Sequence, residues 1–230
     1  MSQRRSTRAG APAAPIEEEE DDSSLEEAVN ECTRYILCRE ASKLPIKRAD
    51  IAKHLATVCQ TPSGVVSRVI LRTDKLLEKV YGYKLVPIAG KAMSQYIVVL
   101  KEECESLPSS ISDSHQRIML MAALTHIFMS GGNVKEDDMW NFLSEAGLLD
   151  ANDFAGKKNF VATFTRQLYL TVNKVGEGEF TKNVFEWGRR ATEEVPKLFV
   201  LNKMAEAFEK TPDYWSEQFK QANEEAQQRS

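Results

Sequence analysis

Apolar and polar positions along the chain form two successive series, each with helical spacing first and strand-like spacing afterwards. The first series spans residues 25–101 and the second spans residues 113–210. Between them, residues 102–112 are polar and contain a proline, which is typical of a linker. Each series predicts three helices followed by a two-stranded hairpin.

In the first series, apolar residues recur at intervals of three and four. Helices are expected at about residues 25–39, 47–58 and 65–80, and strands at residues 83–88 and 95–100. Gly82 is placed to end the third helix. The residues expected to face the core are Leu25, Val29, Cys32, Ile36, Ile51, Leu55, Val58, Val66, Val69, Thr73, Leu76, Leu77 and Val80.

The second series repeats this order. Asp113 caps a helix that is apolar almost all round, so we expect the two halves to pack closely in order to cover it. Gly131 and Gly132 then permit a turn. Asn133 and Glu136 predict the capping box of the next helix. Further elements are expected at residues 157–166 (helix), 168–173 and 183–187 (hairpin) and 192–208 (a helix that buries Leu198, Leu201, Ala205 and Phe208).

Three helices followed by a hairpin is the order of a winged-helix domain. The chain is therefore predicted to be mainly α with small β-hairpins, arranged as two tandem winged-helix domains. Residues 1–24 lack apolar periodicity and include the acidic run Glu17–Asp22, which predicts a disordered tail. Residues 211–230 are expected to form a polar C-terminal tail.

The net charge of −4 conceals two halves of opposite sign. Residues 25–101 carry 13 Lys and Arg against 7 Asp and Glu, whereas residues 102–210 carry 12 against 17. A basic half joined to an acidic half suggests two surfaces with different partners. A chance imbalance among solvated faces is the alternative.

Four cations of the third helix share one edge on a helical wheel at ~100° per residue. In helix-turn-helix proteins the corresponding helix lies in the major groove of DNA, which makes this edge a candidate site for weak DNA binding. A solvated edge and a surface that faces a protein partner are the alternatives. The candidate DNA-binding residues are Arg68, Arg72, Lys75 and Lys79.

Motifs for catalysis or metal binding are missing from the sequence. The histidines lie far apart with no Cys or His at ligand spacing, so no metal site and no cofactor are predicted. No P-loop, G-x-S-x-G or H-E-x-x-H occurs. The acids at residues 136–138 complement a helix macrodipole more simply than they would serve catalysis. We therefore predict a protein that is not an enzyme and has no small-molecule substrate. The histidines are His54, His115 and His126, and His126 is expected to be a hydrogen-bonded core or edge residue.

Four scattered cysteines without a C-x-x-C pair fit a reducing compartment. No run of about 18 apolar residues exists, so no membrane span is expected. The N-terminus has no apolar stretch of the kind found in secretory signals. Ser23 and Ser24 lie beside acids and are either phosphorylation sites or an ordinary helix cap, which is the simpler interpretation.

Two segments of the second half resemble the MAGE homology domain: IFMSGGNVKEDDMWNFLSEAGL at residues 127–148 and VFEWGRR at residues 184–190. Upstream, YILCREASKLPIKRADI and VYGYKLVPI fit the first half of the same family. The resemblance covers about residues 25–210. It implies two tandem winged helices, in agreement with the periodicity.

The resemblance also implies an adaptor. Members of this family bind and modulate RING-type ubiquitin ligases. The ancestral member bridges a RING subunit and the kleisin of the SMC five/six DNA-repair complex, and contacts DNA. By this resemblance the protein is nuclear, and it holds a RING-type E3 ligase subunit through its first half and a kleisin through its second. A winged-helix transcription regulator is the alternative function.

One family motif can be placed by position. The family has a Leu-Leu pair on its first helix, which contacts the RING partner, and the matching positions here are Ile36 and Leu37. With the neighbouring Tyr35, these are the candidate RING-partner-binding residues. Because Ile36 also belongs to the predicted core stripe, packing is its alternative role.

Overall fold

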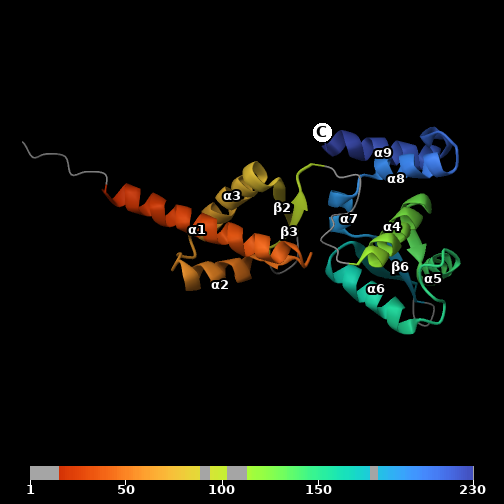
Figure 1. Cartoon of the computed structure of the whole chain (residues 1–230), viewed down its shortest axis with the longest axis horizontal. Coiled ribbons are helices and arrows are strands. Elements are labelled where there is room, and N and C mark those ends of the chain that lie inside the picture. The colour runs from red at the N-terminus through yellow and green to blue at the C-terminus, as the bar shows by residue number, and fades with distance from the viewer. Residues whose placement is uncertain (1–15, 89–93, 103–112, 177–180, 230) are drawn as a thin grey trace, which may run out of the picture.

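The structure, a computed structural model, describes residues 16–88, 94–102, 113–176 and 181–229 (Figure 1). The first half consists of α1 (Ile16–Glu40), β1 (Ile46–Lys47), α2 (Arg48–Val58), α3 (Val66–Leu76), a π-helical turn (Leu77–Tyr81), β2 (Tyr83–Ile88) and β3 (Gln95–Leu100). The second half consists of α4 (Ser114–Met129), β4 (Asn133–Lys135), α5 (Glu136–Glu145), α6 (Phe154–Arg166), β5 (Leu170–Val175), β6 (Lys182–Trp187), α7 (Arg189–Glu194), α8 (Lys197–Ala207), a 3-10 turn (Pro212–Tyr214) and α9 (Ser216–Arg229).

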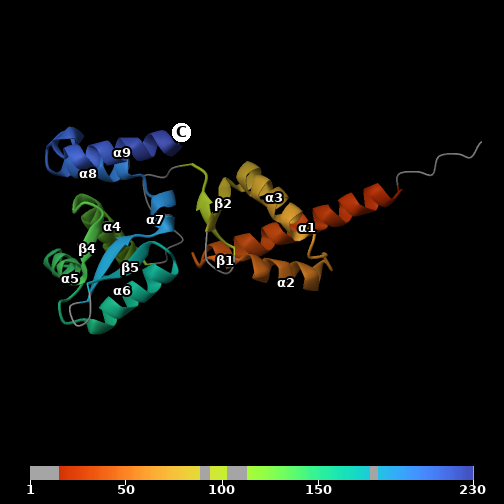
Figure 2. The same ribbon diagram turned by 180° about the vertical axis from the view of Figure 1, so that it is seen from behind.

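Both halves contain a three-stranded antiparallel sheet of the same topology, β1-β3-β2 and β4-β6-β5 (Figure 2). In each half three helices precede a hairpin whose second strand lies in the centre of the sheet. The register pairs Tyr83 with Leu100 in the first hairpin and Leu170 with Trp187 in the second. The predicted fold class, mainly helical with two tandem winged helices, is confirmed.

The short first strand of each sheet was not predicted from the sequence. β1 and β4 contain two and three residues, too few to show a period of two. Asn133 belongs to β4, and α5 follows Lys135 without any side-chain cap. The predicted capping box of Asn133 and Glu136 is therefore wrong. The turn before it is confirmed, because Gly131 and Gly132 have φ values of 90° and 102°.

The N-terminal helix is longer than predicted. α1 begins at Ile16, so residues 16–24, which were predicted to be disordered, are helical. The sequence of this segment has no apolar stripe, so its periodicity did not predict a helix. Residues 1–15 lie outside the described part of the chain, as do residues 103–112 of the predicted linker and the tips of both hairpins.

The C-terminal residues fold back on the second half instead of forming the predicted tail. Ala222 of α9 is 1% exposed, and Trp215 and Phe219 pack against the same core. An ion pair of 3.1 Å joins Lys197 Nζ at the start of α8 to Glu225 Oε2. Three apolar residues at steps of four and three are a narrow stripe, which is easily missed in a polar segment.

Three residues predicted to face the core are exposed: Val58, Val80 and Phe208, with exposed fractions of 52%, 60% and 59%. Each lies at the end of a helix, where the helical wheel no longer predicts direction. Val80 lies in the π-helical turn, whose larger number of residues per turn rotates the following side chains. The predicted helix at residues 192–208 is interrupted at Pro196, which separates α7 from α8.

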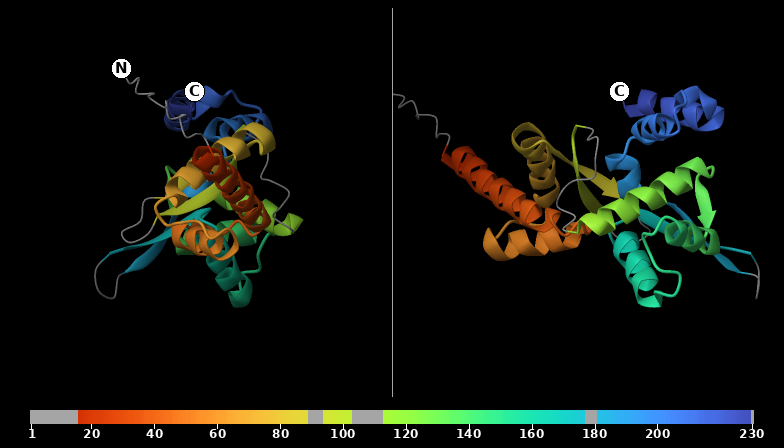
Figure 3. Two further views of the ribbon diagram at one scale, coloured as in Figure 1. Left: turned by 90° about the vertical axis from the view of Figure 1, so that its left-hand side faces the viewer. Right: turned by 45° about the vertical axis from the view of Figure 1, so that its right-hand side comes forward.

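The two halves lie side by side along the long axis, and the N-terminal end of α1 projects away from the second half (Figures 1 and 3). Each half has its own apolar core. A small third cluster joins them, in which Val86, Ile97 and Val99 of the first sheet pack against Leu168 of the second half.

Candidate interaction surfaces

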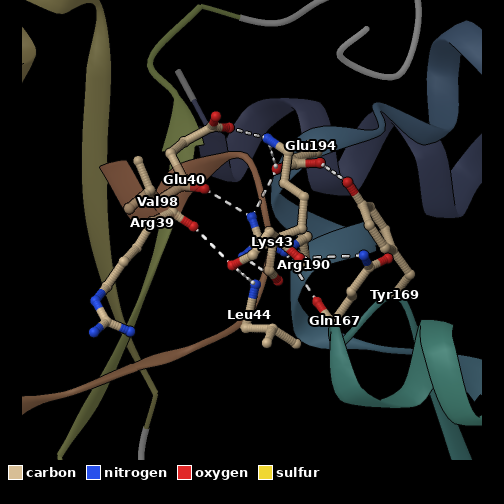
Figure 4. Close-up of polar contacts among 10 residues, drawn as sticks. Arg39, Glu40, Lys43, Leu44, Val98, Gln167, Tyr169, Arg190 and Glu194 are labelled. Atoms are coloured by element: carbon tan, nitrogen blue, oxygen red, sulfur yellow. Dashed lines mark hydrogen bonds and ion pairs between the residues drawn. The ribbon is translucent and has the colours of Figure 1, made fainter. Parts of the chain in front are cut away.

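A buried arginine joins the two halves (Figure 4). Arg190 of α7 donates hydrogen bonds across the interface from Nη1 to the carbonyl of Val98 (2.7 Å) and from Nη2 to that of Lys43 (3.0 Å). Within its own half it donates from Nε to the carbonyl of Gln167 and from Nη1 to Glu194 Oε1, both at 2.9 Å. With 1% of Arg190 exposed, the partners of the guanidinium are protein groups from both halves.

Four further charged or polar groups surround Arg190. Glu194 accepts a hydrogen bond from the Tyr169 hydroxyl at 2.5 Å, and its Oε1 lies 3.7 Å from Lys43 Nζ. Lys43 also pairs with Glu40 at the end of α1. Burial and the adjacent Glu194 carboxylate raise the pKa of Tyr169, which keeps the phenol protonated as a donor. We call Glu40, Lys43, Tyr169, Arg190 and Glu194 the interdomain cluster.

Local backbone packing places Arg190 at this interface. A Cβ at Gly188 would lie 2.2 Å from the carbonyl oxygen of Leu168, so only glycine fits there. The same carbonyl accepts a hydrogen bond of 2.9 Å from the backbone N–H of Arg190. On the other side, Lys43 adopts a left-handed conformation with φ of 56° and is 2% exposed. Such a conformation costs of order 1–3 kcal/mol in a non-glycine residue and needs support from its surroundings.

The candidate RING-partner-binding residues divide between core and surface. Ile36 has an exposed fraction of 0% and packs within the first core, so it offers no surface to a partner. Tyr35 and Leu37 are half-buried at the edge of that core. The ring of Tyr35 is contacted by the ring of His54 (centroids 4.4 Å apart) and by the guanidinium of Arg39 (4.4 Å from the centroid).

A surface pocket of about 410 Å³ opens beside Tyr35 and contains fixed charges. Glu31 accepts hydrogen bonds from Arg34 (2.9 Å) and interacts with His54 Nε2 (2.6 Å). These contacts hold the pKa of Glu31 below its ordinary value. The pocket therefore offers an aromatic wall next to charges of both signs. Its lining residues are Glu31, Arg34, Tyr35, Cys38, Arg39 and His54.

The four candidate DNA-binding residues are all exposed, as the wheel predicted. Arg68, Arg72 and Lys75 belong to α3, whereas Lys79 lies in the π-helical turn that follows it. Arg72 Nη1 forms an ion pair of 3.0 Å with Asp22 Oδ1 of α1. The edge is thus accessible to an outside anion, which would compete with Asp22 for Arg72.

The second half carries an open groove of about 670 Å³ between α5 and α6. Trp140 lines it, held edge-on against Phe160 and Phe185 with ring centroids 5.9 and 5.4 Å apart. Lys157 Nζ lies 5.6 Å from the Trp140 ring, and Phe154 is 76% exposed. The groove combines apolar surface with acids on one helix and lysines on the other. Its lining residues are Glu136, Asp137, Trp140, Phe154, Lys157, Lys158, Val161 and Ala162.

Over the described residues, no three His, Cys, Asp or Glu side chains form a group that could hold a metal ion. His54 contacts Glu31, and His115 bonds the carbonyl of Leu148 at 2.9 Å. His126 stacks on Phe142 with centroids 4.2 Å apart, but its Nε2 has no hydrogen-bond partner in the described part of the chain. The expectation of a hydrogen-bonded histidine is therefore not met at Nε2, and burial lowers the pKa of His126. No helix in the described ranges is long and apolar enough to cross a membrane.

A family model for the MAGE homology domain matches residues 32–198. This chain belongs to the MAGE family. The human protein "Non-structural maintenance of chromosomes element 3 homolog" is 30% identical over 218 residues, which are 92% of this chain and 71% of that one. The mouse protein of the same name is 29% identical over 216 residues, 91% and 76% of the two chains. A solved chain of the Nse1-Nse3-Nse4 complex superimposes with a TM-score of 0.73 at 29% identity, covering 87% of this chain and 98% of that one.

The resemblance to the MAGE family that residues 127–148 and 184–190 indicated is thus confirmed. The MAGE match ends near the start of α8, although α9 completes the second core through Ala222. The interdomain cluster and the α5–α6 groove of this MAGE chain were not predicted from its sequence. One feature of the sequence could have indicated the Arg190–Glu194 pair: the segment GRRATEE places opposite charges four residues apart on a helix. That spacing does not say whether the pair is buried.

Proposed function

We propose that this protein is a non-enzymatic adaptor subunit of the SMC five/six DNA-repair complex. It holds a RING-type ubiquitin ligase subunit on its first half and a kleisin on its second, and it acts in the nucleus in chromosome maintenance. The observation that carries the proposal is the likeness of 87% of the chain, at a TM-score of 0.73, to a chain of the Nse1-Nse3-Nse4 complex. By the family resemblance, the two other subunits named in that complex would be the RING-type subunit and the kleisin.

The surface around Tyr35 and Leu37 supports a RING contact on α1. Both side chains are half-buried, so a partner completes their burial at a small cost in ordering. The neighbouring pocket adds Arg34 and Arg39, and arginine and tyrosine are enriched among residues that dominate binding energy. Binding at this surface is how the protein would stimulate the ligase.

The α5–α6 groove suits an amphipathic helix of the kleisin. An exposed aromatic ring at Phe154 and the half-buried Trp140 give apolar anchoring points, as in helix-in-groove recognition. Lys157 and Lys158 on one helix and Asp137 on the other would select the orientation of a charged partner helix.

Phe154→Asp is expected to weaken kleisin binding about tenfold or more, because the carboxylate would be desolvated in the groove without a partner. Isothermal titration calorimetry with the purified kleisin segment measures this. Phe208→Asp is the matched control, since Phe208 is similarly exposed but lies at the end of α8. Equal effects of the two substitutions would remove the groove from the kleisin interface.

Reconstitution tests the proposed function as a whole. Co-expressed with a RING-type subunit and a kleisin, the full chain should elute as a single ternary complex and should increase ubiquitin transfer by the RING subunit. A transcription regulator would bind duplex DNA tightly and neither partner. Failure to form any complex with either partner would overturn the proposal.

The exposed cations of α3 support weak, sequence-independent DNA contact as part of this function. Replacing Arg68, Arg72, Lys75 and Lys79 together by Glu is expected to weaken binding strongly, but still measurably at low salt, in fluorescence anisotropy. The salt slope should become shallower by about 0.9 for each phosphate that the protein no longer neutralises. The control reverses four exposed lysines elsewhere, at Lys53, Lys203, Lys210 and Lys220. Unchanged affinity and slope in the α3 variant would exclude this helix, and loss of a protein partner alone would make it a protein-binding surface.

A further inference from the structure

Two serines precede the first core residue of α1. Ser23 and Ser24 lie well inside the helix, which begins at Ile16, so the interpretation of these serines as a helix cap is wrong. Both are exposed, as is Asp22, whereas Leu25 is 3% exposed. Among the residues whose side chains are described, unwinding residues 22–24 therefore exposes no buried side chain, and such a segment opens at low cost.

The sequence around these serines is that of a substrate for acid-directed serine kinases. Glu26 lies three residues after Ser23, and Glu27 lies three residues after Ser24. The acidic run Glu17–Asp22 lies immediately before them. A kinase whose substrate groove is basic recognises this arrangement by charge.

The same segment lies beside the basic edge of α3. Asp22 Oδ1 pairs with Arg72 Nη1 at 3.0 Å, and Thr73 Oγ1 donates to the carbonyl of Val29 at 3.5 Å, which places α1 against α3. One helical turn is about 5.4 Å, so residues 23 and 24 lie within one turn of Asp22 along α1. Charges in water interact over a Debye length of about 8 Å at physiological salt, so a phosphate placed next to Asp22 would act on Arg72, the cation with which Asp22 already pairs.

We propose that Ser23 and Ser24 are phosphorylation sites that reduce the DNA contact of α3. The serine Oγ attacks the γ-phosphorus of ATP, the bond from this phosphorus to the β–γ bridging oxygen breaks with its electron pair leaving on ADP, and the hydroxyl proton passes to a base of the kinase. Each phosphate adds a charge of about −1.5 to −2 and competes with DNA phosphate for the same cations. The inference rests on the proposed DNA contact, and it adds regulation of that contact by phosphorylation.

The test begins with the full chain, ATP and a purified kinase of the casein-kinase type. Mass spectrometry should find phosphate on Ser23 and Ser24, and none on the Ser23→Ala/Ser24→Ala variant within this segment. Anisotropy with a short DNA duplex should then show binding about three- to tenfold weaker at low salt, with a difference that shrinks as salt rises. Absence of phosphate at these serines, or phosphate without a change in affinity, would overturn the proposal.

A second measurement avoids the kinase. Ser23→Asp/Ser24→Asp should weaken DNA binding, whereas Ser130→Asp/Ser216→Asp, which adds the same charge on exposed residues of the second half, should not. Equal weakening would show an effect of net charge and would overturn the local mechanism. The α3 charge-reversal variant separates the two proposals. If it binds DNA normally, the proposed DNA contact has failed, whereas phosphate stoichiometry still reports on the serines.

Discussion

Arg190→Met is expected to destabilise the protein by about 3–5 kcal/mol, because it removes one partner of a buried ion pair. Glu194 would lose the guanidinium and would keep Lys43 Nζ at 3.7 Å and the Tyr169 hydroxyl as partners among the described residues. The carbonyls of Val98 and Lys43 would lose their hydrogen bonds from Arg190 as well. Since these two hydrogen bonds cross the interface, the substitution should loosen the packing of one half on the other and also lower the free energy of unfolding.

Urea denaturation of the full chain measures the first effect, and limited proteolysis within residues 103–112 measures the second. Arg189→Met is the matched control: this neighbour pairs with Glu193 at 2.6 Å but is 54% exposed at its side chain. Exposed pairs contribute about 0–1 kcal/mol, so the control should be nearly as stable as the natural protein. If both variants unfold at the same urea concentration and are cut at the same rate, the cluster does not hold the halves together.

Leu37→Asp is expected to weaken binding of the RING partner about 100-fold with only a small loss of stability. A carboxylate at an apolar interface pays its desolvation cost in the complex, while in the free protein the half-buried position leaves it access to water. Truncating a residue at the centre of an interface costs about 2 kcal/mol or more, which is about 30-fold or more in affinity. Calorimetric titration with the purified RING subunit, together with a melting curve, tests this.

Two further variants separate a contact from a packing effect. Val58→Asp places the same charge on an exposed apolar residue of α2 and should leave affinity unchanged. Ile36→Ala should cost about 2–5 kcal/mol of stability, because it opens a cavity in the first core, and should retain affinity once folded. A collapse of the melting temperature for Leu37→Asp would place Leu37 in the core and exclude it as a contact.

The helical wheel predicted local features well because they depend on a few residues in sequence. It placed Ile36 in the core stripe and the α3 cations on a solvent-facing edge, as the structure confirms. The assignment of Ile36 to a partner surface came from the family motif instead, and its burial argues for the packing role. The contacts of Tyr35 and Leu37 with a RING subunit remain predictions.

Helix ends and short strands were the least predictable elements. At a helix end the backbone departs from regular helical rotation, so the helical wheel no longer predicts which side chains are buried. Val58 and Val80 are exposed for this reason. The acidic start of α1 has no apolar stripe, so a search for helical periodicity does not find it. Strands of two and three residues exist because β3 and β6 offer them backbone partners, and no pattern within so few residues predicts that pairing.

The sequence alone established two repeats of three helices and a hairpin, because each periodic segment is long enough to define the face it buries. Only the tertiary structure revealed that Arg190 is buried, since the carbonyls and the carboxylate that accept its hydrogen bonds come from both halves. It likewise revealed that α9 belongs to the second core. A polar segment with three apolar residues packs as a helix only where the folded protein offers an apolar surface for those residues, and otherwise it remains an unpacked tail. Here the second half provides that surface.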